Sequence, residues 1–276
     1  MQTDTITVPG GTLYYELRGA GPVLLLIPGG PMDAGGFAAL AERLADRYTV
    51  VTYDCLGNSR SPYDGSPEEL TVDRHADDAQ RLLEVVGAEP AYVLGSSGGA
   101  IYGLDLVARH PGCAHTLVAH EPPLSVLLPD ADRWRAFNEE IAATYREEGA
   151  FAAMAKFGAG TGLGGGGPEP ATPEAEAAAA RMMGNLDLFA GYLIPVVGRH
   201  TPDLAALRAS STRIVVGVGE ASTPEQLPYR TSHAVADELG RAPVMFPGGH
   251  GGFASDPDAF SARLQEVLSG RVQQAA

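Results

Sequence analysis

The 276-residue sequence is poor in positive charge and in cysteine. It has 19 basic against 34 acidic residues, a formal net charge of −15, and Lys156 is its only lysine. Such a surface repels nucleic acid and anionic membranes, so we expect neither as a partner. The two cysteines, Cys55 and Cys113, form no CxxC pair and have no Cys/His ligand spacing, so we expect no structural zinc site.

Long apolar runs are also missing. The longest, VLLLIP at 23–28, is far too short to span a bilayer. The N-terminus, MQTDTITVPGG, lacks the basic and apolar regions of a secretory signal, so we expect a cytoplasmic protein. The sequence contains no phosphate-binding loop and no dinucleotide fingerprint, and we expect neither a metal nor a cofactor.

What is present is an alternation of short apolar runs with segments of helical period. Continuous apolar runs of this length are typical of strands buried on both faces. The alternation predicts an α/β fold with a mostly parallel eight-stranded sheet covered by helices on both faces. It pauses between about 122 and 210, where only helical patterns occur. We therefore predict a core of residues 1–121 and 211–276, with 122–210 inserted as a helical lid or cap.

The pentapeptide GSSGG at 95–99 follows a predicted strand and opens a predicted helix. In that context G-x-S-x-G is typical of a nucleophile elbow, a strained turn that exposes a serine hydroxyl. We favour Ser97 over Ser96, because the Ser96 frame places Leu94 where the elbow has glycine. The helix N-terminus favours negative charge at Ser97, and the Gly98 N–H is a candidate oxyanion donor.

Four motifs in order make the sequence similar to the α/β-hydrolase superfamily. They are LLLIPGGP at 24–31, TYDCLGNSRSP at 52–62, GSSGG at 95–99 and GGHGGF at 248–253. The resemblance implies that the first motif is the oxyanion loop, in which the N–H of Gly30, or that of Met32, is the second donor. It implies that Asp54 shapes a loop and that His250 is the general base.

The acid departs from the superfamily pattern. The usual carboxylate follows the seventh strand, where this sequence has Gly-Glu-Ala-Ser and the expected position holds Ser222. Two replacements are open: Glu220, two residues early, and Glu121, at the tip of the strand after the elbow helix. Some branches of the superfamily, haloalkane dehalogenases among them, place the acid at that strand tip. We favour Glu121, because a carboxylate between an apolar strand and two prolines needs a partner such as a histidine N–H.

The resemblance and the Ser/His pair predict a cofactor-independent serine hydrolase of the carboxylic-ester hydrolase type. We expect it to be a monomer or homodimer that cleaves a hydrophobic ester, lactone or thioester through a Ser97 acyl-enzyme. One alternative is a non-hydrolytic or C–C-cleaving enzyme of the same fold. Another is a ligand-binding protein that has lost catalysis. The candidate pocket residues are Met32, Trp134, Phe157, Met183, Phe189 and Phe253.

Overall fold

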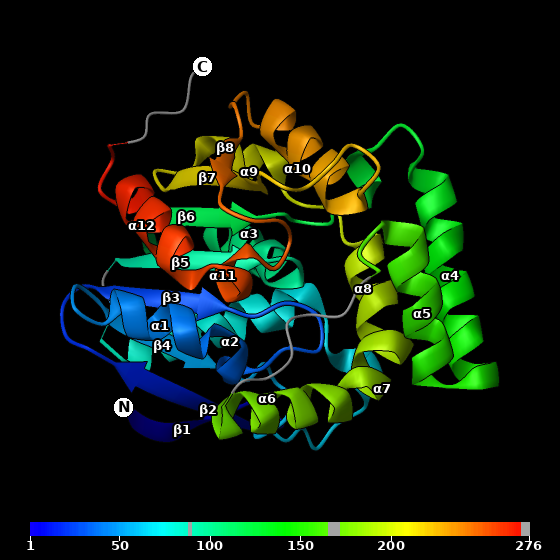
Figure 1. The fold of residues 1–276 in the computed structure, drawn as a ribbon, viewed down its shortest axis with the longest axis horizontal. Coiled ribbons are helices and arrows are strands. Elements are labelled where there is room, and N and C mark those ends of the chain that lie inside the picture. Colours follow the sequence, from blue (N-terminus) through cyan, green and yellow to red (C-terminus); the bar gives the residue numbers. More distant parts are fainter. Residues whose placement is uncertain (88–89, 165–171, 272–276) are drawn as a thin grey trace.

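A computed structural model of the protein describes residues 1–87, 90–164 and 172–271, and its centre is an eight-stranded sheet (Figure 1). The strand order is β1-β2-β4-β3-β5-β6-β7-β8. The β1–β2 and β2–β4 pairs are antiparallel and all other pairs are parallel, so the predicted sheet is confirmed. The strands are β1 (Gln2–Val8), β2 (Gly11–Arg18), β3 (Val23–Ile27), β4 (Thr49–Tyr53), β5 (Ala91–Ser96), β6 (Ala114–His120), β7 (Arg213–Gly219) and β8 (Val244–Phe246).

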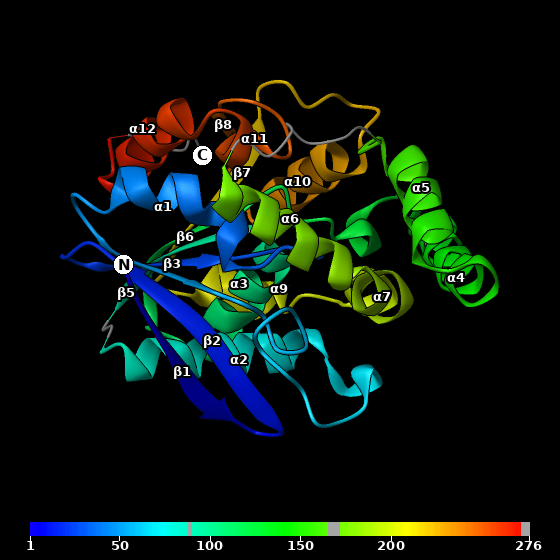
Figure 2. The same cartoon turned by 60° about the horizontal axis from the view of Figure 1, so that its bottom comes forward.

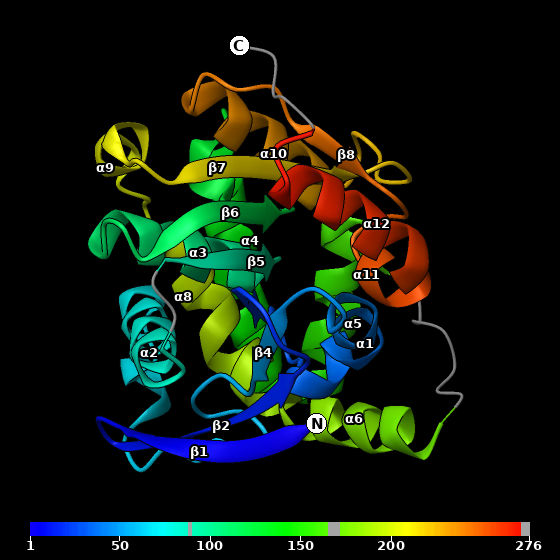
Figure 3. The ribbon, with the colours of Figure 1, turned by 90° about the vertical axis from the view of Figure 1, so that its left-hand side faces the viewer.

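Helices cover both faces of the sheet. The α-helices are α1 (Ala38–Leu44), α2 (Val72–Val85), α3 (Gly98–Arg109), α4 (Ala131–Glu148), α5 (Ala150–Thr161), α6 (Pro173–Gly184), α7 (Leu186–Leu188), α8 (Ile194–Arg199), α9 (Leu204–Ala209), α10 (Leu227–Glu238), α11 (Gly252–Ser255) and α12 (Pro257–Leu268). The short 3-10 helices are η1 (Ala34–Phe37), η2 (Pro67–Glu69) and η3 (Ser125–Leu127), and η4 (Phe189–Leu193) is a π-helical turn. Figures 2 and 3 show α1 and α12 on one face, with α2 and α3 on the other.

The unbroken apolar run of β3 is explained by these two layers. Successive strand residues point to opposite faces, so an apolar run needs cover on both. Leu24 and Leu26 enter the core that contains residues of α1 and α12. Leu25 and Ile27 enter the core that contains residues of α2 and α3.

Helices α4 to α9 lie in residues 122–210, between β6 and β7 in the chain; we call this segment the helical insertion. Figure 1 shows α4 and α5 beyond the carboxyl ends of the central strands. Within the insertion, α6 packs against η1, the short helix that follows the loop after β3. The insertion thus reaches the edge of the sheet where strands of a parallel sheet carry functional side chains.

Both cysteines, Cys55 and Cys113, are free thiols, and Cys55 is buried.

Across residues 1–87, 90–164 and 172–271, the helices lack the combination of length and apolarity that crossing a bilayer requires.

The turn between β5 and α3 has no room for a side chain at Gly95 or Gly99. A Cβ on Gly99 would lie 2.2 Å from the Ile27 carbonyl oxygen and 2.7 Å from the Pro28 carbonyl oxygen. A Cβ on Gly95 would lie 2.2 Å from the Gly99 carbonyl oxygen. These neighbours are backbone atoms and cannot rotate away, so glycine is what allows α3 to begin against the end of β3.

We predict that Gly99→Ala lowers the free energy of unfolding by about 1–3 kcal/mol or more, the usual cost of overpacking a rigid site. Gly184→Ala is the matched control, because nothing lies within 4 Å of a Cβ at that position at the end of α6. The control should be unchanged or gain up to about 1 kcal/mol. Urea denaturation measures both, and equal midpoints for the two variants would contradict the prediction.

Candidate active site

Ser97 occupies a strained turn at the carboxyl end of β5. Its backbone angles are φ 56° and ψ −123°, outside the regions that side chains ordinarily allow. The Ser97 N–H donates to the His120 carbonyl oxygen at 2.9 Å, which extends the β5–β6 ladder by one residue. Ser97 is half-buried, whereas Ser96 is buried. The sheet and α3 together hold this residue in a conformation that an isolated peptide would avoid.

Glu121 occupies the neighbouring strand tip, directly after β6. It too has a positive φ, 51°, and its N–H donates to the Gly217 carbonyl oxygen at 3.0 Å. The side chain is fully buried. Because His120 pairs with Ser96 across the two strands, Glu121 is placed beside Ser97 by the ladder itself.

The Glu121 carboxylate is bound by three donors. Its Oε2 lies 2.6 Å from His250 Nδ1. Its Oε1 accepts from the Gly219 N–H at 2.9 Å and from the Ser222 hydroxyl at 2.6 Å. The bond between His250 and Glu121 Oε2 places the Nδ1 proton toward the carboxylate. This fixes the tautomer of His250 and leaves Nε2 as the acceptor.

These partners keep Glu121 ionised. Burial alone would raise its pKa, but the hydrogen bond and the charge of His250, the nearby His120 and the Ser222 hydroxyl lower the pKa to about 2. A buried carboxylate without such donors would take up a proton instead. The site therefore contains a negative charge at the Nδ1 edge of the imidazole.

The two acids considered from the sequence differ sharply in position. Glu220 is exposed, and its N–H pairs with the Phe246 carbonyl oxygen as part of the turn after β7. No hydrogen bond or ion pair joins Glu220 to His250 among the described residues. Ser222 holds the position where a superfamily acid was expected, and it donates to Glu121. Sequence reasoning did not foresee this contact, although the missing carboxylate at 222 was its signal.

His250 and Ser97 come from loops at the same edge of the sheet. His250 follows β8 and precedes α11, and its side chain is 24% exposed. In this structure the Ser97 hydroxyl makes no hydrogen bond to His250, and such bonds are often long before a substrate binds. His120 is buried between Phe246 and Phe260, and burial lowers its pKa to about 4, so it is neutral.

The candidate oxyanion donors lie next to one another. A Cβ on Gly98 would lie 3.7 Å from Gly30 N, so the two backbone segments are in contact. Neither the Gly30 nor the Gly98 N–H donates to another described residue. The Met32 N–H donates to the Gly29 carbonyl oxygen at 3.2 Å, which makes Gly30 the better second donor.

Four of the six pocket candidates lie in surroundings that the sequence did not show, and their role in a pocket stays a prediction. Phe253 packs on Phe37, with ring centroids 4.8 Å apart, in the core beneath α1 and α12. Trp134 is buried in a small cluster between α4 and α10. Met183 is 45% exposed and belongs to none of the described core clusters. Met32 packs against the same core as Phe253.

Phe157 and Phe189 are the pocket candidates that the structure brings toward the site. Their rings are 5.8 Å apart in an edge-to-face arrangement. A Cβ on Gly30 would lie 3.5 Å from Cζ of Phe189, so this ring lies beside the candidate oxyanion segment. The pair therefore provides an apolar wall next to the polar groups.

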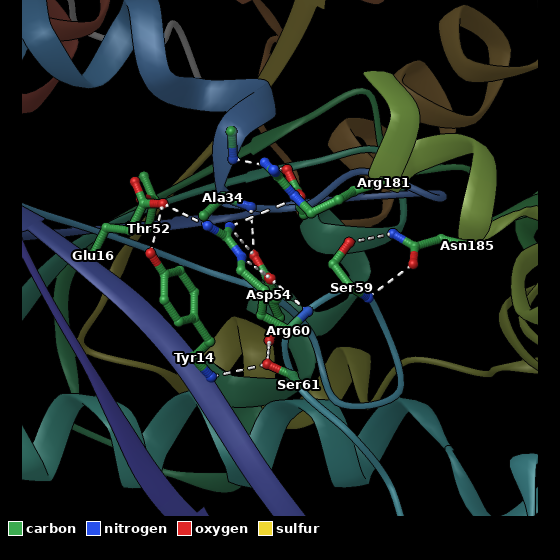
Figure 4. Close-up of polar contacts among 12 residues, drawn as sticks. Tyr14, Glu16, Ala34, Thr52, Asp54, Ser59, Arg60, Ser61, Arg181 and Asn185 are labelled. Carbon is green, nitrogen blue, oxygen red and sulfur yellow. Dashed lines mark hydrogen bonds and ion pairs between the residues drawn. The ribbon is translucent and has the colours of Figure 1, made fainter. Parts of the chain in front are cut away.

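Asp54 directly follows β4 and organises the loop after that strand. Its carboxylate accepts from the Ala34 N–H at 3.0 Å, from the Arg60 N–H at 3.0 Å and from the Arg60 guanidinium at 2.8 Å (Figure 4). Asp54 makes no contact with His250, and its geometry is that of a loop-shaping residue. Within the described part of the chain, no group of three or more His, Cys, Asp and Glu side chains could hold a metal ion.

Comparison with known proteins adds to this geometry. The family model described as the alpha/beta hydrolase fold matches residues 22–159. An uncharacterized hydrolase, YraK of Bacillus subtilis, is 37% identical over 273 residues, which cover 97% of this chain and 96% of YraK. RutD of Azorhizobium caulinodans, a putative carbamate hydrolase, is 39% identical over 99 residues, 36% of this chain and 37% of RutD.

Solved structures share the fold over nearly the whole chain. A hydrolase from Pseudomonas aeruginosa PA01 has a TM-score of 0.73 and 25% identity, covering 96% of this chain and 98% of its own. A thermophilic esterase from Thermogutta terrifontis has a TM-score of 0.76 and 20% identity, and the match covers 98% of this chain and 99% of the esterase.

The pKa of Glu121 generates a prediction about acid stability. The folded pKa of about 2 lies below the ordinary value of 4.5, so the stabilisation is complete above pH 4.5 and is lost as the pH falls toward 2. The loss should be on the order of 3 kcal/mol. Glu121→Gln should remove this part of the pH dependence, and the exposed Glu220→Gln should not. Urea denaturation from pH 6 to pH 2 measures it; parallel curves for wild type and Glu121→Gln would contradict it.

Proposed function

Because the chain belongs to the α/β-hydrolase fold family and is a hydrolase, we propose that it cleaves acyl compounds through an acyl-enzyme on Ser97. The single observation that carries the proposal is the hydrogen bond between buried Glu121 and His250 beside the strained Ser97 turn. A serine is a weak nucleophile unless a base takes its proton, and an ionised carboxylate strengthens and orients that base.

The proposed reaction has two halves. In the first, His250 Nε2 takes the Ser97 proton while Oγ bonds to the acyl carbon. The carbonyl oxygen becomes an oxyanion held by the Gly30 and Gly98 N–H groups. The leaving group departs with the proton from His250, which gives the acyl-enzyme. In the second half, His250 deprotonates a water that attacks the acyl carbon, and Ser97 leaves with the proton returned.

The substrate class follows from what surrounds the reacting groups. Phe157 and Phe189 place apolar surface beside Gly30, which suits an uncharged acyl or alkyl group. We therefore propose a small hydrophobic ester, lactone or thioester. The partial likeness to a putative carbamate hydrolase makes a carbamate ester a further candidate, because its reacting carbon is also an acyl carbon.

The alternative of non-hydrolytic chemistry loses its main support, and the intact Ser/His pair argues against lost catalysis. The first alternative was motivated by the missing acid after the seventh strand. The 2.6 Å contact of Glu121 with His250 provides a carboxylate from the neighbouring strand, which removes that reason. Hydrolysis in ¹⁸O-labelled water separates the first alternative, since only hydrolysis places one labelled oxygen in the acid product.

We predict that a fluorophosphonate forms one covalent adduct, on Ser97, and that Ser97→Ala abolishes it. Hydrolysis of p-nitrophenyl butyrate should fall by at least about 10³-fold in the same variant. Ser96→Ala is the matched control, because Ser96 is adjacent but buried within β5. Intact-mass labelling with peptide mapping measures the adduct. Undiminished hydrolysis by Ser97→Ala would refute the nucleophile.

We also predict that Glu121→Gln lowers kcat by about 10²–10⁴-fold, since an amide cannot hold the imidazole in the same tautomer or stabilise its charge. Glu220→Gln should stay within about threefold of wild type, because Glu220 is exposed. Steady-state kinetics with the same ester measures both variants. A larger loss of kcat in Glu220→Gln than in Glu121→Gln would show that Glu220 is the acid.

A further inference from the structure

Three residues of the helical insertion face the candidate oxyanion segment at a spacing of four. Arg181 belongs to α6, Asn185 caps its end and Phe189 begins η4. Residues four apart lie on one face of a helix, so these side chains form a single stripe. Each of them contacts a different residue between Gly30 and Asp33, as the next paragraphs set out.

Asn185 makes the central contacts, and it is only 5% exposed. Its Nδ2 donates to the Pro31 carbonyl oxygen and to the Ser59 hydroxyl, both at 2.9 Å. Its Oδ1 accepts from the Ser59 N–H at 2.8 Å. Only one orientation of the amide satisfies both neighbours, because the Pro31 carbonyl can only accept and the Ser59 N–H can only donate.

Ser59 is held in an unusual conformation at this junction. It has a φ of 49°, one of three positive values at non-glycine positions among the described residues. Figure 4 shows the Asn185 amide directed at both the hydroxyl and the N–H of Ser59, while Arg60 turns toward Asp54. Asn185 therefore joins the loop after β4 to the loop after β3 through one side chain.

The two ends of the stripe complete the contact. The Arg181 guanidinium pairs with the carboxylate of Asp33, whose other oxygen accepts from the Gly35 N–H at 2.8 Å. The Phe189 ring lies against Gly30, 3.5 Å from where a Cβ would be. The insertion thus touches the segment on both sides of the Pro31 carbonyl.

We propose that Asn185 is a positioning residue for catalysis, which holds the Pro31 carbonyl and thereby sets the direction of the Gly30 N–H. This inference rests on the proposed function, since it assigns a purpose to the oxyanion donor of that reaction. Within residues 30–32, Pro31 has no N–H to donate, and the Met32 N–H closes a turn onto Gly29. Among the described residues, the bond from Asn185 to the Pro31 carbonyl is therefore the one hydrogen bond that reaches this stretch from the rest of the protein.

The energetic argument is one of alignment. An oxyanion donor acts only when it is aimed at the position the oxyanion will occupy, and losing one costs about 10²–10³-fold in kcat. A displacement near 1 Å costs up to about 10²-fold. Loss of the Asn185–Pro31 bond should therefore lower kcat by about 10- to 100-fold, while KM, which reports ground-state binding, changes much less.

Asn185→Asp isolates the bond that matters. The aspartate still accepts from the Ser59 N–H, and the Ser59 hydroxyl can rotate to donate to it. It cannot donate to the Pro31 carbonyl. Gln226→Ala is the matched control: Gln226 Nε2 donates to the Gly162 carbonyl oxygen at 3.0 Å, so it too bridges the insertion and the core through an amide, but far from Pro31 in the sequence.

The experiment measures kcat and KM for p-nitrophenyl butyrate, the thermal midpoint, and the Ki of an alkyl trifluoromethyl ketone. Such a ketone adds a serine hydroxyl reversibly, and its oxygen then occupies the oxyanion position. We expect Asn185→Asp to lose about 10- to 100-fold in kcat and to raise Ki by a similar factor, with KM within about threefold. Gln226→Ala should match wild type in all three kinetic values.

Other results overturn the inference. If folded Asn185→Asp keeps kcat and Ki within about threefold of wild type, the Pro31 bond does not position the donor. If Asn185→Asp fails to fold, Asn185→Ala, which buries no unpaired carboxylate, carries the same expectation; unfolding of both would make the role structural. Failure of the proposed function looks different, because wild type itself would then neither label at Ser97 nor hydrolyse the ester.

Discussion

The burial of one negative charge governs the architecture of this site. Glu121 is fully buried at a strand tip, and an isolated carboxylate there would be protonated or would destabilise the fold. The Gly219 N–H, the Ser222 hydroxyl and His250 prevent that. The first two come from the end of β7 and the turn after it, and His250 comes from the loop after β8. The charge therefore gathers two separate chain segments around one carboxylate, and the imidazole is oriented as a consequence.

The position of the proposed acid, Glu121, shortens the structural path to the proposed nucleophile, Ser97. Glu121 and Ser97 extend neighbouring strands, and the Ser97 N–H bonds to the carbonyl of the residue before Glu121. Both residues have a positive φ, which costs free energy. The contacts of the surrounding sheet must hold these two residues in that conformation. An acid placed after β7 would reach the nucleophile through one more strand pair. Here the Gly219 N–H at the end of β7 and the Ser222 hydroxyl in the turn after it donate to the Glu121 carboxylate, and Ser222 stands where the superfamily acid was expected.

Much of the fold and part of the candidate site could be predicted from the sequence, and there is a physical reason why the rest could not. The sheet and the Ser97 turn are local patterns: apolar runs report burial on two faces, and glycines report close backbone approach. Glu121 was favoured because a buried carboxylate requires a partner, which is an energetic argument independent of topology. The pocket residues were less predictable, because Trp134 and Phe253 are apolar in a core and in a pocket alike. The contacts of Asn185 could not be predicted from the sequence, since they depend on which loops the insertion reaches in the folded protein.

The two halves of the proposed machinery are anchored to different parts of the protein. The proposed acid and base are held by the ends of β6 and β7 and the loop after β8, where Glu121 is fully buried and the His250 side chain is 24% exposed. The oxyanion segment is held from outside, by a stripe of side chains on the helical insertion. A shift of α6 would therefore move the Gly30 donor while leaving the Glu121–His250 pair in place. On the proposed mechanism, sequence variation in the insertion affects activity in two ways. One is through the apolar groups proposed to meet the substrate, and the other is through the direction of the Gly30 N–H, which sets the rate at which a bound substrate reacts.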